Sequence, residues 1–276
     1  MKIAYIGIDL FAPALEILLS EGCELLELFT CRTDNLTEFN SKVISIAQNA
    51  GVPYKLDRIT IADFVRLKEK GCEAVFCAGY YYKIPVFPDI PTLNIHPSLL
   101  PKGRGGWPMP IAILRRERES GVTIHKIAEG FDTGDIVVQR SFVLEEKENL
   151  ETFMQKVYAL LPEMLSYLIE NFDEAYKNAV PQSGMAEYLE MPDKSMYTIY
   201  PDTEYEKAEL VLRAFYGYDC YYNDGNNEYM LIRAKALKKA DIKTENSHTD
   251  EKCAFFSIKD GYVACEKSNV KVCNDM

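Results

Sequence analysis

The sequence lacks several features that mark whole classes of protein. It contains no run of about 18 uninterrupted apolar residues, and its N-terminus enters an apolar strand pattern without a basic leader. These absences argue against a membrane span and against export, so we expect a cytoplasmic protein. Low-complexity tracts are also missing, and the 12% aromatic content argues against long disordered regions.

A basic excess is missing as well. The chain of 276 residues carries 42 acidic and 31 basic side chains, which gives a formal net charge of −11. Proteins that grip a nucleic-acid backbone usually present a basic patch. The composition therefore argues against a nucleic-acid partner.

Motifs for metals and dinucleotides are absent too. The eight cysteines include no C-x-x-C pair and the chain has three histidines, so we expect reduced thiols and no metal site. The turn at Gly7-Ile8-Asp9 does not fit Gly-x-Gly-x-x-Gly, and the glycine-rich stretch 102–107 lacks the strand-to-helix context of a phosphate-binding loop. NAD binding is therefore not expected.

Short apolar runs alternate with amphipathic segments along most of the chain. This alternation predicts an α/β fold with a doubly wound, mainly parallel sheet covered by helices on both faces. The expected strands are 2–7, 25–30, 54–56, 74–78, 92–95, 121–127 and 136–142. The expected helices are 12–21, 41–49, 61–70 and 150–170.

The texture of the sequence changes near Met191, where prolines and clustered tyrosines begin. Short β patterns follow at 229–236, 254–258 and 262–265, with Asp260-Gly261 as a hairpin turn and Lys238 to Lys252 as an exposed charged loop. We therefore predict a catalytic domain at 1–190 and a small, mainly β C-terminal domain at 191–276. The length and the 47% hydrophobic content suffice for one substantial core plus such a module.

One segment groups side chains that do chemistry. Asn94 and His96 are two residues apart at a strand end, so their side chains emerge on one face, where ligands bind in such sheets. A carboxylate from the turn at 130–135 can orient the imidazole. No covalent nucleophile stands beside them, because Ser98 lies between two prolines and is typical of a turn. The pattern favours acyl transfer directly to an incoming nucleophile.

Three motifs carry a resemblance to a known family. They are Asn94-x-His96-x-Ser98-Leu99-Leu100-Pro101, Gly121-Val122-Thr123-Ile124-His125 and Asp132-Thr133-Gly134-Asp135. In this order and spacing the chain resembles the formyltransferases that use 10-formyltetrahydrofolate. The resemblance implies a Rossmann-like formyltransferase fold over 1–190, 10-formyltetrahydrofolate as formyl donor without a metal, and Asn94, His96 and Asp132 as the catalytic residues.

Each catalytic residue has an expected role and an open alternative. His96, with an unperturbed pKa near 6.5, moves a proton between the attacking amine and the leaving folate nitrogen, and a core or turn histidine is the alternative. Asn94 donates to the developing oxyanion, although it could instead cap the following turn. Asp132 fixes the tautomer of His96 and stabilises its cation, while Asp135 shapes the turn; the alternative is that both aspartates only form the turn. We expect no role for His125 in the site.

The resemblance also implies the folate-binding residues, which act mainly through their backbone. They are Tyr82, Ile84, Ala128, Glu129 and Gly130. Packing at the end of the sheet is the alternative for the tyrosines. We nominate Lys102 and Arg104 for an anionic group of the substrate, and Tyr222 for stacking on a base. A solvated loop and a packed core, respectively, are the alternatives.

Members of the family formylate methionyl-tRNA, glycinamide ribonucleotide or nucleotide-linked amino sugars. The identity of the acceptor must therefore be inferred from the segments that differ between them. The stretch 32–40 is short and not basic, and the C-terminal segment has no basic excess. We therefore expect a nucleotide-linked amino sugar, with methionyl-tRNA as the alternative. A formyltetrahydrofolate hydrolase or a noncatalytic binding module fits less well. Whether two copies form a homodimer through the tyrosines stays open.

Overall fold

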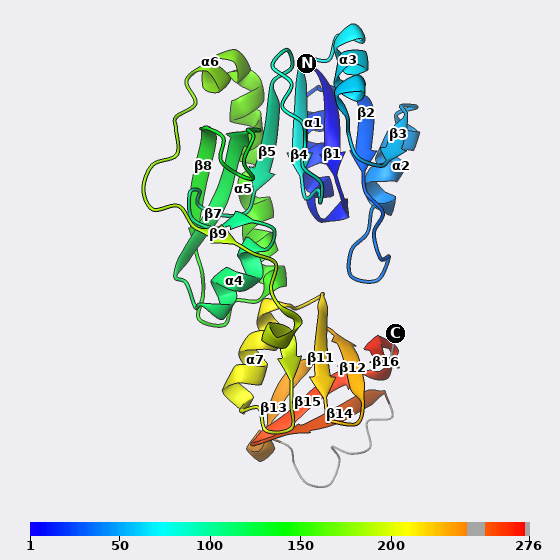
Figure 1. The fold of residues 1–276 in the computed structure, drawn as a ribbon, viewed down its shortest axis with the longest axis vertical. Coiled ribbons are helices and arrows are strands. Elements are labelled where there is room, and N and C mark those ends of the chain that lie inside the picture. Colours follow the sequence, from blue (N-terminus) through cyan, green and yellow to red (C-terminus); the bar gives the residue numbers. More distant parts are fainter. Residues whose placement is uncertain (242–251, 274–276) are drawn as a thin grey trace. The chain divides into compact units, whose positions relative to one another are not determined.

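A computed structural model describes residues 1–241 and 252–273 (Figure 1). The chain divides into two compact units. The first comprises Met1–Pro108, Glu119–Val143 and Gln155–Glu190, and the second comprises Met109–Arg118, Leu144–Met154 and Met191–Met276. Because the units interleave along the chain, the division into domains at residue 190 stays a prediction.

The first unit contains a seven-stranded sheet within the described residues, in the order β3-β2-β1-β4-β5-β7-β8. The first five of these strands pair in parallel, while β7 is antiparallel to both β5 and β8. This confirms the predicted α/β fold with a mainly parallel sheet. The strands are β1 (Lys2–Gly7), β2 (Glu24–Thr30), β3 (Tyr54–Leu56), β4 (Ala74–Ala78), β5 (Thr92–His96), β7 (Glu119–Lys126) and β8 (Ile136–Val143).

Helices form where the amphipathic pattern predicts them. These are α1 (Ala12–Ser20), α2 (Ser41–Asn49), α3 (Ile61–Glu69) and α5 (Leu150–Glu170). Two short helices, α4 (Pro108–Leu114) and α6 (Phe172–Lys177), were not expected, because six or seven residues give too little helical periodicity to recognise.

The central strands of the sheet are buried on both faces. On one face, α3 packs Phe64 and Leu67 against Ala4 and Val75 of the central strands. On the other face, the ring of Phe76 lies edge-on to Phe172 of α6, with the ring centroids 6.3 Å apart. Alternate residues of each strand therefore point to different helices, as a doubly wound sheet requires.

Within its described residues, the second unit holds two small sheets. The sheets are β10-β11-β12-β16 and β13-β15-β14. The strands are β10 (Thr198–Ile199), β11 (Asp219–Asn223), β12 (Glu228–Ile232), β13 (Lys235–Lys238), β14 (Cys253–Ile258), β15 (Gly261–Glu266) and β16 (Val270–Cys273). The predicted turn near Asp260 joins β14 to β15 as an antiparallel hairpin. Most of the predicted charged loop falls on residues 242–251, outside the described residues.

Two features of this unit differ from expectation. Helix α7 (Tyr205–Ala214) forms inside the tyrosine-rich segment, and it buries Ala208, Val211 and Leu212 at helical spacing. The strand expected at 229–236 is broken in two, because Arg233 adopts the left-handed conformation with φ of 58°.

Two general observations complete the fold. No helix among the described residues is long and apolar enough to cross a membrane. All eight cysteines lie in the described ranges, where they are free thiols and six are buried.

The start of α3 carries a buried acidic group. Asp63 accepts hydrogen bonds from the backbone N–H of Thr60 and from its hydroxyl, and it pairs with Lys55 at 2.8 Å and with Arg66 at 2.9 Å. Burial opposes its ionisation, but these donors outweigh burial and lower the pKa of Asp63 to about 2.

We predict that Asp63→Asn lowers the free energy of unfolding by about 2 kcal/mol at pH 7. Because the folded-state pKa is depressed, this difference shrinks as the pH falls from about 4 to about 2. Urea unfolding across this range measures it. Asp89→Asn, which removes an exposed ion pair with Lys68, is the matched control and should change stability by less than about 1 kcal/mol. A deficit for Asp63→Asn that does not depend on pH would contradict the prediction.

Candidate active site

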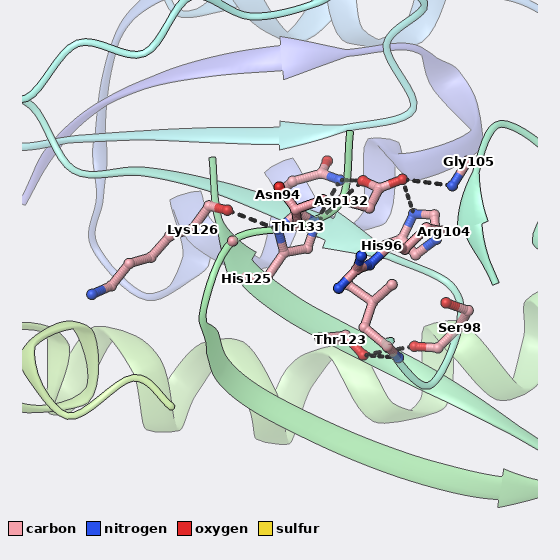
Figure 2. A network of polar contacts seen from close by, with 12 residues as sticks. Asn94, His96, Ser98, Arg104, Gly105, Thr123, His125, Lys126, Asp132 and Thr133 are labelled. Carbon is pink, nitrogen blue, oxygen red and sulfur yellow. Dashed lines mark hydrogen bonds and ion pairs between the residues drawn. The ribbon is translucent and has the colours of Figure 1, made fainter. Parts of the chain in front are cut away.

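Strand β5 delivers two of the predicted catalytic residues at its carboxyl end. Asn94 and His96 alternate with the buried Ile95, so both side chains leave the same face of the strand. The antiparallel neighbour β7 places His125 directly opposite Asn94 in the register. Figure 2 shows these side chains gathered around Asp132.

Asp132 lies in the turn between β7 and β8 and adopts a left-handed φ of 53°. Its Oδ1 accepts from Asn94 Nδ2 at 3.2 Å and lies 3.3 Å from His125 Nε2. Its Oδ2 accepts from the backbone N–H of Gly105 at 2.9 Å and lies 3.8 Å from His96 Nδ1 (Figure 2). The structure thus brings Asn94, His96 and Asp132 together, although their catalytic roles stay a prediction.

The contacts of His96 define its tautomer. Its Nε2 lies 2.7 Å from the carbonyl oxygen of Gly103, and a carbonyl can only accept, so Nε2 carries the hydrogen. The other nitrogen, Nδ1, faces Asp132 across 3.8 Å, which is too long for a direct hydrogen bond. Nδ1 is therefore the ring nitrogen left to exchange a proton with a reacting group.

The carboxylate and the imidazole shift each other's titration. Burial opposes ionisation of Asp132, but His96, His125 and the N–H of Gly105 outweigh it and hold the pKa of Asp132 well below its usual range. Burial lowers the pKa of His96, and the nearby charge of Asp132 opposes that shift without cancelling it. At neutral pH the site therefore holds an ionised Asp132 beside a neutral His96.

His125 belongs to this cluster, contrary to the expectation from sequence. It is 1% exposed, and its Nδ1 donates to the carbonyl oxygen of Lys126 at 2.8 Å. Its Nε2 therefore accepts from Asn94 Nδ2 at 3.1 Å, which turns the amide nitrogen of Asn94 inward. This contact follows from the register between β5 and β7, which cannot be read from the sequence alone.

The turn after His96 is held by the hydroxyl of Ser98. This hydroxyl lies 2.9 Å from the carbonyl oxygen of Lys102 and 3.2 Å from that of Gly103. The same Gly103 carbonyl accepts from His96, so the turn orients the imidazole. The hydroxyl of Ser98 is therefore engaged with the turn, as a turn former would be, and its lack of a nucleophilic role stays a prediction.

The glycine-rich segment 102–107 forms the other wall of the cluster. Gly105 has φ of 106°, and a Cβ atom there would lie 2.1 Å from the carbonyl oxygen of Leu189, so a side chain cannot be accommodated. The guanidinium of Arg104 is bound to Gln182, whereas Lys102 is exposed. That Lys102 and Arg104 bind an anionic group of the substrate stays a prediction.

The two segments nominated for folate lie side by side. An ion pair of 3.4 Å between Lys83 and Glu129 joins them. The ring of Tyr82 is half-buried and lies under the guanidinium of Arg58, 4.6 Å from the ring centroid, whereas Ile84 is part of the buried core. Folate contacts of Tyr82, Ile84 and Ala128 to Gly130 stay a prediction.

Tyr222, nominated for stacking on a base, belongs to the second unit. It is 5% exposed, its hydroxyl donates to the carbonyl oxygen of Ser257, and its ring packs on Phe256 at 4.9 Å. These contacts are typical of a core residue, and binding of substrate by Tyr222 stays a prediction.

Known proteins are similar to this chain in the segment that contains the cluster. Residues 60–169, which include the whole cluster around Asp132, match the formyl transferase family. The methionyl-tRNA formyltransferase of Ehrlichia ruminantium (strain Gardel) is 38% identical over 133 residues, which cover 47% of this chain and 42% of that relative. The match thus spans less than half of that relative's length.

Two solved structures extend the comparison. Phosphoribosylglycinamide formyltransferase from Bacillus halodurans is 28% identical, with a TM-score of 0.52 over 64% of this chain and 99% of that one. HypX from Aquifex aeolicus, solved in complex with tetrahydrofolic acid, shares the fold with a TM-score of 0.69, at 18% identity over 97% of this chain and 44% of that one. The family match, the sequence relative and the shared fold agree: residues 60–169 are similar to the formyl transferase family, and the chain shares the fold of these solved structures.

Proposed function

We propose that this protein transfers a formyl group from 10-formyltetrahydrofolate to a primary amine. The observation that carries the proposal is the buried cluster of Asn94, His96 and Asp132 at the carboxyl end of β5, inside the segment that matches the family. The tetrahydrofolic acid bound to HypX, which has the same fold, supports folate as the carrier.

The reaction follows from the tautomer and charges of the cluster. An uncharged amine attacks the formyl carbon, a C–N bond forms, and the formyl oxygen becomes an oxyanion. His96 Nδ1 accepts the proton released by the amine, and ionised Asp132 stabilises the resulting imidazolium. Collapse breaks the bond to the folate nitrogen, which takes this proton from His96 and leaves as tetrahydrofolate.

Asn94 supplies the donor for the oxyanion in this proposal. Both hydrogens of its Nδ2 face acceptors in the structure, at His125 and at Asp132. The formyl oxygen must therefore replace one of these acceptors as its charge develops. An amide held in place this way stabilises the transition state without a large rearrangement.

The acceptor amine is the finer part of the proposal. The relative from Ehrlichia ruminantium is named methionyl-tRNA formyltransferase, and this supports methionyl-tRNA as the acceptor over the amino sugar expected from charge. The amino sugar remains the second candidate because residues 191–276 hold 15 acidic and 12 basic side chains, so counterion release offers little help to tRNA binding.

We predict turnover when 10-formyltetrahydrofolate is combined with the correct acceptor, and complete loss of turnover in His96→Ala. The assay follows tetrahydrofolate release with charged initiator methionyl-tRNA, with dTDP- and UDP-linked amino sugars, and with glycinamide ribonucleotide. Turnover on tRNA that falls steeply with salt supports the first candidate. Turnover on an amino sugar supports the second, while release without any acceptor indicates a hydrolase and contradicts formyl transfer to an amine.

We predict that Asp132→Asn lowers kcat by about 100-fold or more, because the imidazolium loses its counter-charge. Asp132 raises the pKa of His96 against the effect of burial, so the inflection of His96 in the pH–rate profile should move to lower pH. Asp135→Asn alters the same turn at an exposed carboxylate paired with Lys126, and it should leave the profile unchanged. An unshifted profile in Asp132→Asn would sink the assignment.

We predict that Asn94→Ala lowers kcat by about 100- to 1,000-fold with a smaller effect on KM, because an oxyanion donor acts mainly in the transition state. Asn40→Ala removes another buried amide, which donates to the carbonyl of Cys31, and it should keep a wild-type kcat. If Asn94→Ala raises KM at constant kcat, Asn94 binds substrate uniformly and is not an oxyanion donor.

A further inference from the structure

We propose that Gln182 is a positioning residue, which holds the Asp132 turn against His96 from a segment distant in sequence. This inference rests on the proposed function, because it assigns Gln182 to the reaction that Asp132 and His96 perform. Gln182 does not belong to any of the motifs by which the sequence indicates the site, and it lies outside the segment that matches the family.

Gln182 uses its whole side-chain amide within the site. Its Nε2 donates to the backbone carbonyl of Asp132 at 2.8 Å and to that of Gly134 at 2.7 Å. Its Oε1 accepts from Arg104 Nε at 3.0 Å and from Nη2 at 2.7 Å. Two donor hydrogens and two lone pairs are all that a glutamine amide offers, so each one is satisfied.

The segment around Gln182 is anchored at both ends. Val180 exchanges backbone hydrogen bonds with Ile136 at the start of β8. At the other end, β9 (Tyr188–Leu189) pairs with β6 (Arg104–Gly105). The segment 180–189 therefore bridges the two loops that contact the imidazole of His96, the Asp132 turn and the glycine-rich loop.

The Asp132 turn needs such support. Asp132 has a left-handed φ of 53°, which is unfavourable for a residue with a side chain. Two residues further, a Cβ atom at Gly134 would lie 1.8 Å from the carbonyl oxygen of Lys126, so the turn is pressed against β7. Hydrogen bonds to the carbonyls on either side of Thr133 fix the direction in which the Asp132 carboxylate leaves the turn.

The position requires a side chain that donates two hydrogen bonds and accepts two, and glutamine does this whereas residues of similar size do not. A methionine has a similar length but neither donates to the carbonyls nor accepts from Arg104. The positive charge of Arg104 polarises the amide and strengthens the two donated bonds. Arg104 thus orients the amide of Gln182 by donating to its oxygen, while the hydrogen bonds from Gln182 to the carbonyls of Asp132 and Gly134 hold the turn in position.

The test measures the titration of His96 by NMR of labelled imidazole in wild type, Gln182→Ala and Gln182→Met. The chain has three histidines, so single substitutions assign the signals. When the Asp132 turn is released, His96 loses part of the charge that raises its pKa, and we expect its titration to move to lower pH in both variants. In the formyl-transfer assay kcat should fall by about 10- to 100-fold, since small displacements of a catalytic group have such effects.

Two control variants separate positioning from general loss of structure. Gln139→Ala removes a glutamine that donates to the carbonyl of Leu100 and to the hydroxyl of Thr123. It should lower thermal stability without moving the titration of His96. Arg104→Ala keeps the donations of Gln182 and removes a positive charge, so it should not lower the pKa of His96.

The proposal is overturned if both Gln182 variants titrate like wild type, or if Gln139→Ala shifts His96 equally. The NMR titration needs no turnover, so it separates the two proposals. A shift of His96 in an enzyme that transfers no formyl group would retain the positioning role and refute the function. An unshifted His96 in an active enzyme would do the reverse.

Discussion

The site depends on keeping one carboxylate charged inside the protein. A buried carboxylate is stable only when hydrogen bonds and counter-charges replace the water it has lost. Asp132 obtains hydrogen bonds from the amide of Asn94 on β5 and from the backbone N–H of Gly105 in the glycine-rich loop. The imidazoles of His96 on β5 and His125 on β7 lie within 3.8 Å of it and supply counter-charge when they are protonated. Each of these elements must be in place for the ionised form to persist.

The change of strand direction in the sheet makes this possible. In the parallel part, neighbouring strands end at the same edge, and β5 brings Asn94 and His96 there. The antiparallel β7 then sets His125 opposite Asn94, and the turn that follows returns Asp132 to the same edge. A wholly parallel sheet would need a long crossover before the carboxylate could meet the imidazole.

Local sequence patterns predicted the strands and helices that have strong periodicity. They did not predict contacts between residues that are far apart in the sequence. The strands and longer helices of the first unit follow from alternation and spacing, and so does the placement of Asn94 and His96 on one face of β5. His125 needed the register between β5 and β7, and Gln182 needed a contact across 50 residues to Asp132. Helix α7 was not predicted, because tyrosines are typical of strands and its surroundings are rich in them. In the structure the helix is favoured because it buries Ala208, Val211 and Leu212.

The distance of Gln182 along the chain bears on how the protein is made. During synthesis the strands of the sheet leave the ribosome first, and domains generally fold as units as they emerge. The segment 180–189, which ties the Asp132 turn to the glycine-rich loop, follows the last of these strands by tens of residues. A nascent chain can therefore assemble its sheet well before the cluster is complete, and the geometry of Asn94, His96 and Asp132 is among the last features of the first unit to form.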